Sequence, residues 1–214
     1  MKLAAGLAIL LPLMAPAAGK DELAQAMASK PDAAHGAALY VQCASCHGVD
    51  GAGAAEGSTP RIAGQHFPVL LKQLADFRAG RRRDFRMEGL ADRHHLAGPQ
   101  DMADVAAYVS GLGSGGVRGI GDGTHSTAGA LLFGARCASC HGADGRGNAA
   151  RFVPRLAGQH YGYLVRQMYD AVDERRSTLV EVHARKIEPL DYDQVRGIAD
   201  YLSRIAPPAP PRAP

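Results

Sequence analysis

The sequence contains no tryptophan, and aromatic residues occupy only 6% of its 214 positions. Large aromatic side chains fill much of a typical core, so a small domain without them has little material for one. Yet 46% of the residues are hydrophobic, which is typical of a globular protein and not of a disordered one. We therefore expect something large and apolar, other than side chains, to complete the core.

Strong charge and long apolar runs are also missing. The formal net charge is only +3, which argues against binding to nucleic acid. The apolar run at residues 3–14 is too short to span a bilayer comfortably, and it follows Lys2 as in a secretory leader. Ala15 and Ala17 fit an A-x-A cleavage pattern. We assign residues 1–18 to a signal peptide and expect an exported protein, with an uncleaved membrane anchor as the alternative.

Only four cysteines occur, and all of them lie in two copies of the pentapeptide CASCH, at residues 43–47 and 137–141. In an exported protein, four cysteines ordinarily suggest two disulfides. The histidine after each pair favours another chemistry, because in C-x-x-C-H the thiols attach a haem and the histidine binds its iron. A thioredoxin-type centre would need a βαβ pattern, and a zinc site would need a second ligand pair; the sequence has neither.

The sequence therefore predicts two covalently bound haem c groups, which would also complete the thin cores. The residues assigned to them are Cys43, Cys46, Cys137 and Cys140 for covalent attachment, and His47 and His141 as proximal iron ligands.

The offset of 94 residues between the two motifs aligns much more of the chain, which is therefore an internal repeat. TPRIAGQHFPVLLKQLADF in the first copy matches VPRLAGQHYGYLVRQMYDA in the second. The period is too long for a solenoid unit and suits a duplicated domain. We place the first domain at residues 30–112, a Gly-rich linker at 113–127, the second domain at 128–205 and a Pro-rich tail at 206–214.

Each copy has apolar residues at helical spacing and lacks the alternation that predicts strands. The fold class is therefore all-α. The expected helices lie at residues 33–42 and 127–136 before the motifs, at 67–79 and 161–172 after them, and from about 100 and 191 at the end of each copy.

The whole pattern, CxxCHG followed by PR-x-AGQH and a terminal helix with AxY, resembles the dihaem cytochromes c of the c4 class over nearly all of residues 30–205. The resemblance implies two class I cytochrome c domains around a pseudo-twofold axis, with their haem propionates close together. It implies a periplasmic electron carrier, not an enzyme, that moves single electrons in a respiratory chain. Its partners would be redox proteins such as a terminal oxidase, a reductase or a dehydrogenase, and peripheral membrane association stays open.

The resemblance also assigns roles around each haem. The carbonyls of Pro60 and Pro154 would accept a hydrogen bond from the proximal histidines, which orients the imidazole and tunes the iron. Arg61 and Arg155 would contact the haem propionates.

In the first domain, the resemblance places the distal iron ligand at Met87, in the segment before the last helix. Met102 is the rival, but its spacing within that helix suits core packing. A basic run at residues 81–86 adjoins Met87, and we expect it to be a solvated loop, with neutralisation of the haem propionates or steering of an acidic redox partner as alternatives.

The second domain departs from the family pattern, because the counterpart of Met87 is Val180 or Glu181. Three alternatives follow for its distal ligand: His183, Met168, or an open or water-bound iron. An open iron would favour a second function, that of a dihaem oxidoreductase or of a cytochrome subunit in a dehydrogenase complex with an atypical second haem.

Overall fold

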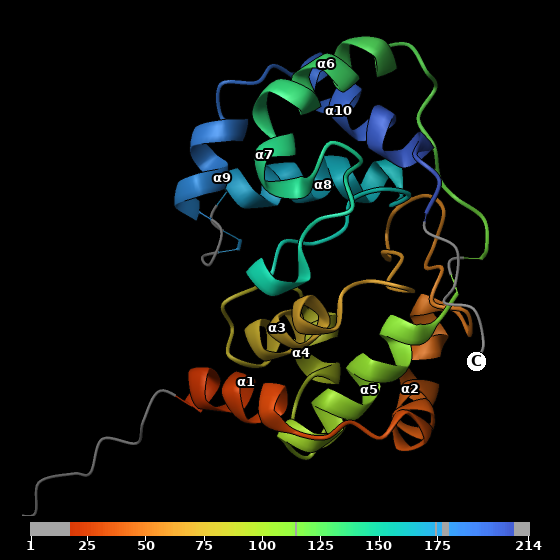
Figure 1. The fold of residues 1–214 in the computed structure, drawn as a ribbon, viewed down its shortest axis with the longest axis vertical. Helices are drawn as coiled ribbons and strands as arrows, with labels where there is room; N and C mark the ends of the chain where they lie inside the picture. Colours follow the sequence, from red (N-terminus) through yellow and green to blue (C-terminus); the bar gives the residue numbers. More distant parts are fainter. Residues whose placement is uncertain (1–17, 114, 174, 177–179, 208–214) are drawn as a thin grey trace, which may run out of the picture.

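The computed structural model describes residues 18–113, 115–173, 175–176 and 180–207. Over these residues the chain is helical, and its only β pairings are two isolated bridges. The helices form two halves stacked along the long axis, with the linker running down one edge (Figure 1). The prediction of an all-α, tandemly duplicated fold is therefore confirmed. Most of the predicted signal peptide and of the Pro-rich tail lies outside the described residues.

The two halves repeat the same order of elements. The first half consists of α1 (Ala18–Ala28), α2 (Ala33–His47), α3 (Phe67–Arg78), α4 (Phe85–Leu90) and α5 (Pro99–Gly111). The second consists of α6 (Ser126–Arg136), α7 (Ala138–His141), the 3-10 turn η1 (Ala149–Arg151), α8 (Tyr161–Val172), α9 (Val180–Ile187) and α10 (Tyr192–Arg204). The predicted helices are all present, whereas α1, α4 and α9 were not expected from the sequence pattern.

Aspartates begin several of these helices by capping their free amides. Asp32 accepts hydrogen bonds from the amides of Ala34 and His35, at 2.8 and 3.1 Å, at the start of α2. Asp191 and Gln194 form a reciprocal capping box at the start of α10. Such caps contribute about 1 kcal/mol each, so the first turn of the helix is determined locally.

In both halves, the helix before the CASCH histidine crosses the last helix at a glycine. A β-carbon at Gly36 would lie 2.0 Å from the carbonyl oxygen of Asp104, and one at Gly129 would lie 1.9 Å from that of Gly197. No side chain fits in such a space, so these glycines allow α2 to pack on α5 and α6 on α10 at backbone distance. Aromatic pairs lie between the same helices, with ring centroids 5.3 Å apart for Tyr40 and Tyr108.

The side-chain cores of both halves are small. The core of the second half has five buried members: Phe133, Leu164, Ile198, Ala199 and Leu202. In the first half, Met102 is completely buried among the core residues of α3 and α5, as its helical spacing predicts. Cores of this size agree with the expectation that a large apolar group completes each domain.

Helix α1 packs on α3 and α5 and has no counterpart among the described residues of the second half. Its Glu22 is buried, 7% exposed, and pairs with Arg78 at 3.0 Å and with Arg93 at 2.7 Å. Ala26 of the same helix is fully buried. Residues before position 30 therefore pack on the first domain.

Two arginines at the interface between the halves form hydrogen bonds with side chains of both halves. Arg82 donates to Gln73 of its own half at 2.7 Å and to Tyr163 and Gln167 of the other half at 2.6 and 2.7 Å. Arg176 donates to Gln167 at 2.9 Å and to Gln73 at 3.0 Å. Arg82, expected in a solvated loop, instead contributes to the contact between domains.

Candidate haem sites

In each half the CASCH segment ends a helix and places its histidine inside the domain. α2 ends at His47 and α7 ends at His141, and the two residues are 5% and 9% exposed. None of the four cysteines forms a disulfide, and Cys46 is exposed whereas the other three are half-buried. Two thiols and one imidazole therefore lie together in each half, as covalent attachment of a haem requires.

Both buried histidines make the same hydrogen bond. Nδ1 of His47 donates to the carbonyl oxygen of Pro60 at 3.0 Å, and Nδ1 of His141 donates to that of Pro154 at 3.1 Å. The proton is thereby fixed on Nδ1, so Nε2 carries the lone pair that can bind a metal ion. Burial lowers the pKa of both imidazoles and favours this neutral form. That these imidazoles bind iron stays a prediction.

Arg61 and Arg155 are suited to bind an anionic group. Nε of each side chain is buried and has no hydrogen-bond partner among the described residues. Burial also lowers the pKa of both guanidinium groups, which means that their positive charge is poorly solvated. A haem propionate beside each arginine would satisfy both the donor and the charge, so the residues present fit the group.

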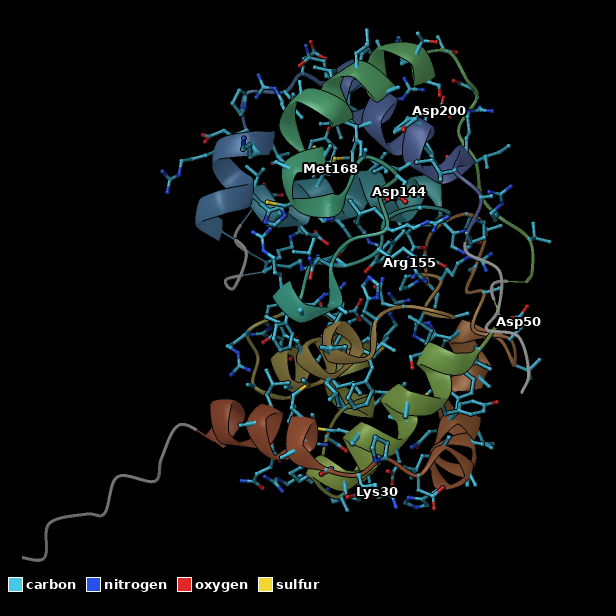
Figure 2. The ribbon with its side chains drawn as sticks, in the orientation of Figure 1. Lys30, Asp50, Asp144, Arg155, Met168 and Asp200 are labelled. Atoms are coloured by element: carbon cyan, nitrogen blue, oxygen red, sulfur yellow. The ribbon has the colours of Figure 1, made fainter. Side chains whose placement is uncertain are left out.

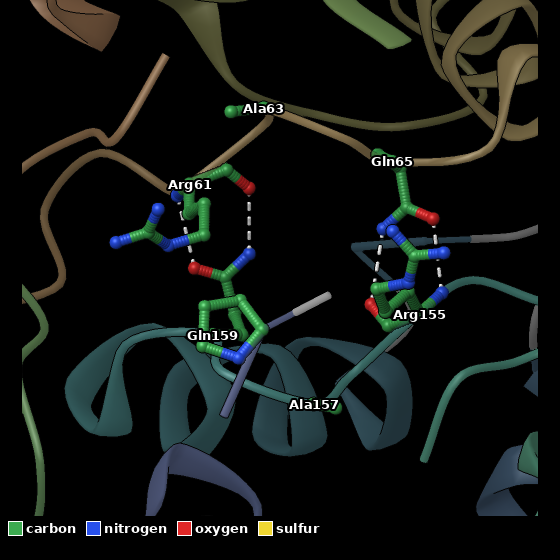
Figure 3. Close-up of a pocket in the computed structure, with 7 residues that line it drawn as sticks. Arg61, Ala63, Gln65, Arg155, Ala157 and Gln159 are labelled. Atoms are coloured by element: carbon green, nitrogen blue, oxygen red, sulfur yellow. Dashed lines mark hydrogen bonds between the residues drawn. The ribbon is translucent and has the colours of Figure 1, made fainter. Parts of the chain in front are cut away.

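The two arginines line one pocket between the halves, shown in Figure 3. The side-chain amide of Gln159 bonds to the backbone of Arg61 through C=O and N–H, at 2.9 and 2.8 Å. Gln65 bonds to the backbone of Arg155 in the same way, at 2.9 and 3.0 Å. The pocket is lined by Arg61, Ala63, Gln65, Arg155, Ala157, Gln159 and Pro207. The repeated AGQH motif marks these glutamines in the sequence, but it does not show that each one contacts an arginine of the other half.

The histidines of the AGQH motifs also bond across the interface. Nε2 of His66 donates to the carbonyl of Arg146 at 2.7 Å, and Nε2 of His160 donates to that of Ala52 at 2.6 Å. His160 is fully buried, and its Nδ1 accepts the amide hydrogen of Gly119 from the linker at 3.0 Å. These histidines therefore join the domains and the linker.

In the first half, Met87 is half-buried on α4, a helix that packs on α3 and is capped by Asp84. Arg86, the residue before Met87, donates to the carbonyl of Ser58 at 3.5 Å, two residues before Pro60, which accepts the hydrogen bond of His47. The segment that carries Met87 therefore lies beside the loop that orients the proximal histidine, and the coordination of iron by Met87 stays a prediction.

In the second half, the corresponding short helix α9 carries His183. Its ring lies opposite that of His141, with centroids 6.2 Å apart and an angle of 67° between the ring planes. Met168 on α8 packs against the core of the second half, beside α7 (Figure 2). The structure thus brings His183 to the predicted second site.

The family model for cytochrome c matches residues 33–113 and, separately, residues 126–206. The chain belongs to the cytochrome c family. It is 36% identical to cytochrome c4 of Azotobacter vinelandii over 156 residues. This match covers 65% of this chain and 71% of that protein. It is also 30% identical over 209 residues to the thiosulfate dehydrogenase electron acceptor of Stutzerimonas stutzeri, over 89% of this chain and 94% of the relative.

Solved structures agree with these relatives. The crystal structure of reduced cytochrome c4 from Pseudomonas stutzeri superimposes with a TM-score of 0.73 at 29% identity, over 83% of this chain and all of that chain. A thiosulfate dehydrogenase from Marichromatium purpuratum gives a TM-score of 0.68 at 30% identity, over 82% of this chain and 40% of that chain. The resemblance to the c4 class is confirmed.

This cytochrome is therefore a dihaem electron carrier with two covalently bound haem c groups, and its partners are redox proteins. Each haem supplies an iron that gains and loses one electron reversibly. The part of the chain that the structure describes contains no helix that is long and apolar enough to cross a membrane.

Proposed function

We propose that this cytochrome is a periplasmic carrier that accepts single electrons from a dehydrogenase and passes them to the next redox protein of a respiratory chain. The observation that carries the proposal is the pocket between the halves, where Arg61 and Arg155 lie with Nε atoms that have no partner among the described residues. Arg61 and Arg155 would each hold a propionate of the haem in its own domain, and each haem would supply an iron that exchanges one electron.

The chain's own residues would keep this arrangement rigid. His47 and His141 are held in one orientation by the proline carbonyls, and the two glutamines hold the backbone of both arginines. Groups that are fixed before an electron arrives need little rearrangement afterwards, which favours fast transfer. Cys43, Cys46, Cys137 and Cys140 would hold the two haems in place through thioether bonds.

Two further observations support the details. The N-terminal sequence has the features of a signal peptide, which supports export to the periplasm. Two relatives are named electron acceptors of thiosulfate dehydrogenase, at 30% and 40% identity, which supports a sulfur-compound dehydrogenase as the electron donor.

The experiment is a reduction assay with thiosulfate and the oxidised holoprotein, with and without catalytic amounts of a thiosulfate dehydrogenase. We expect reduction of both haems only when the dehydrogenase is present, since a carrier does not itself oxidise the substrate. Reduction by thiosulfate alone, sustained when an artificial acceptor is added, would instead support the alternative of a dihaem oxidoreductase. The departure from methionine in the second distal segment is the observation that favours that alternative.

A further inference from the structure

The second haem site must obtain its distal ligand from a different residue than the first. In the first half, α4 carries Met87, whereas the aligned positions in the second half are Val180 and Glu181. Neither residue is a methionine, and Val180 has no group that binds iron. The side chain that lies opposite His141 is therefore the candidate for the second distal ligand.

We infer that His183 is the distal ligand of the second haem, so that this haem has two histidine ligands while the first has a histidine and a methionine. The inference rests on the proposed function, because it requires a haem at the second CASCH segment. The resemblance to the c4 class does not assign this role to His183, because the family pattern places a methionine at this site.

The geometry of the two rings carries the inference. A metal–imidazole bond is about 2 Å long and the ligating nitrogen lies about 1 Å from the ring centre, so two imidazoles on opposite sides of one metal have centroids about 6 Å apart. The centroids of His141 and His183 are 6.2 Å apart. The ring planes are inclined at 67°, so the rings are not stacked, and an edge-to-face contact of two rings spans about 4.5–7 Å. The separation matches that of two ligands of the same iron, and the substitutions below distinguish this role from a simple ring contact.

The placement of α9 agrees with this role. α9 packs on α8 as α4 packs on α3, so the two short helices occupy equivalent positions in the repeat. His183 lies within α9 and is only half-exposed, with its Nδ1 screened from solvent. A histidine of a surface helix would ordinarily point to water, whereas this one faces the interior next to His141.

Met168 is the other candidate, and its surroundings give it a different role. It packs with the core residues of the second half and lies 94 residues after Leu74, which packs against the core of the first half. An exchange of leucine for methionine at a core position conserves volume and is well tolerated. Met168 is therefore a core residue, and an open iron is disfavoured by the imidazole opposite His141.

The different ligands would give the two haems different potentials. Methionine coordination raises the potential of a haem relative to coordination by two histidines. A single electron on this cytochrome would therefore rest mainly on the first haem.

The test is low-temperature EPR of the fully oxidised holoprotein, compared between the wild type, His183→Ala and the matched control Met168→Leu. We expect two low-spin signals in the wild type. His183→Ala should convert one of them to a high-spin signal and leave the other unchanged, which also shows that the variant has folded. Met168→Leu should retain both low-spin signals. A high-spin signal in the wild type, or a loss of the second low-spin signal in Met168→Leu only, would overturn the inference.

A second variant exchanges the proposed ligand for another iron ligand instead of removing it. In His183→Met, the second haem should regain a low-spin signal of the methionine type, and its midpoint potential should rise. A potential equal to that of the wild type would contradict the inference. Haem content per chain, measured as the pyridine haemochrome, separates the two proposals: one haem per chain would refute the second haem site itself, whereas two haems with unchanged spectra in His183→Ala would refute only the ligand.

Discussion

The side-chain amide of Gln159 forms two hydrogen bonds with the backbone of Arg61 in the other domain, at 2.9 and 2.8 Å. Arg61 directly follows Pro60, whose carbonyl accepts the hydrogen bond of His47. One short segment therefore contacts the proximal histidine of the first domain and the body of the second. Docking of the domains and orientation of the imidazole are coupled through two consecutive residues.

Replacement of Gln159 by Leu should weaken the contact between the domains. The leucine fills a similar volume but leaves the buried amide and carbonyl of Arg61 without partners, which costs about 1–3 kcal/mol each in the free energy of unfolding. The measurement is urea denaturation of the holoprotein. The control is Gln25→Leu on the exposed face of α1, which should change stability by less than about 0.5 kcal/mol. Equal stabilities of the two variants would contradict this account of the interface.

Two glycines of the same helix allow a matched test of the helix crossing. Gly129→Ala should destabilise the second domain by about 1–3 kcal/mol, because the new methyl group would meet the backbone of Gly197. A β-carbon at Gly134 would meet no atom within 4 Å, so Gly134→Ala should stabilise α6 by about 0.5–1 kcal/mol. Thermal unfolding of both variants checks the prediction, and opposite signs are the result that the structure requires.

His160 should make the interface sensitive to acid. Burial and the nearby Arg61 lower its folded-state pKa below the ordinary value of 6.5, although the carbonyl of Ala52 and the charge of Glu56 act in the other direction. At low pH the unfolded chain then binds more protons than the folded one, so this contribution to stability is present above about pH 6.5 and is lost as the pH falls. The slope for one proton is at most about 1.4 kcal/mol per pH unit.

The check is the free energy of unfolding between pH 7 and 5 for the wild type, His160→Gln and the exposed control His94→Gln. The slope should decrease in His160→Gln and stay unchanged in His94→Gln. His66, whose pKa is also lowered by burial, should retain part of the slope in every protein. An unchanged slope in His160→Gln would show that folding does not lower the pKa of His160.

Replacement of Met87 should identify the first distal ligand. If Met87 binds the iron, Met87→Ala should lower the potential of one haem and leave the other unchanged, because methionine coordination raises the potential. Met102→Leu is the control, since it conserves volume in a buried core and should cost less than about 1.5 kcal/mol without a change in either potential. A potentiometric titration of both variants decides between the two methionines.

Much of the fold and of the candidate sites can be predicted from the sequence, because each motif can be compared with its second copy in the repeat. CASCH predicts the haem sites from local chemistry, and the spacing of apolar residues predicts α2, α3 and α5 with their counterparts. The partners of Gln65 and Gln159 lie 90 and 98 residues away along the chain, and no local pattern reveals such contacts. Helices α4 and α9 are short, with too few turns for a helical period to be recognised.

The run at residues 81–86 shows the same limit. Its charges favour a solvated loop, yet Arg82 lies over the ring of Phe77 at 4.5 Å and bonds to residues of both domains. Burial and the charge of Arg82 lower the pKa of Arg176, which bonds to the same two glutamines as Arg82, to about 10. Which arginine of the basic run is buried depends on how the second domain docks. The sequence of one repeat does not indicate this arginine.

The central claim is that the two domains form one carrier, in which an electron moves from haem to haem across the pocket between Arg61 and Arg155. The most direct measurement is pulsed one-electron reduction of the oxidised holoprotein, followed by absorbance changes of the two haems over a range of protein concentrations. We predict a redistribution phase in which one haem is reoxidised as the other is reduced, at a rate that does not depend on protein concentration. A rate proportional to concentration would mean that electrons move only between molecules, and would contradict the account.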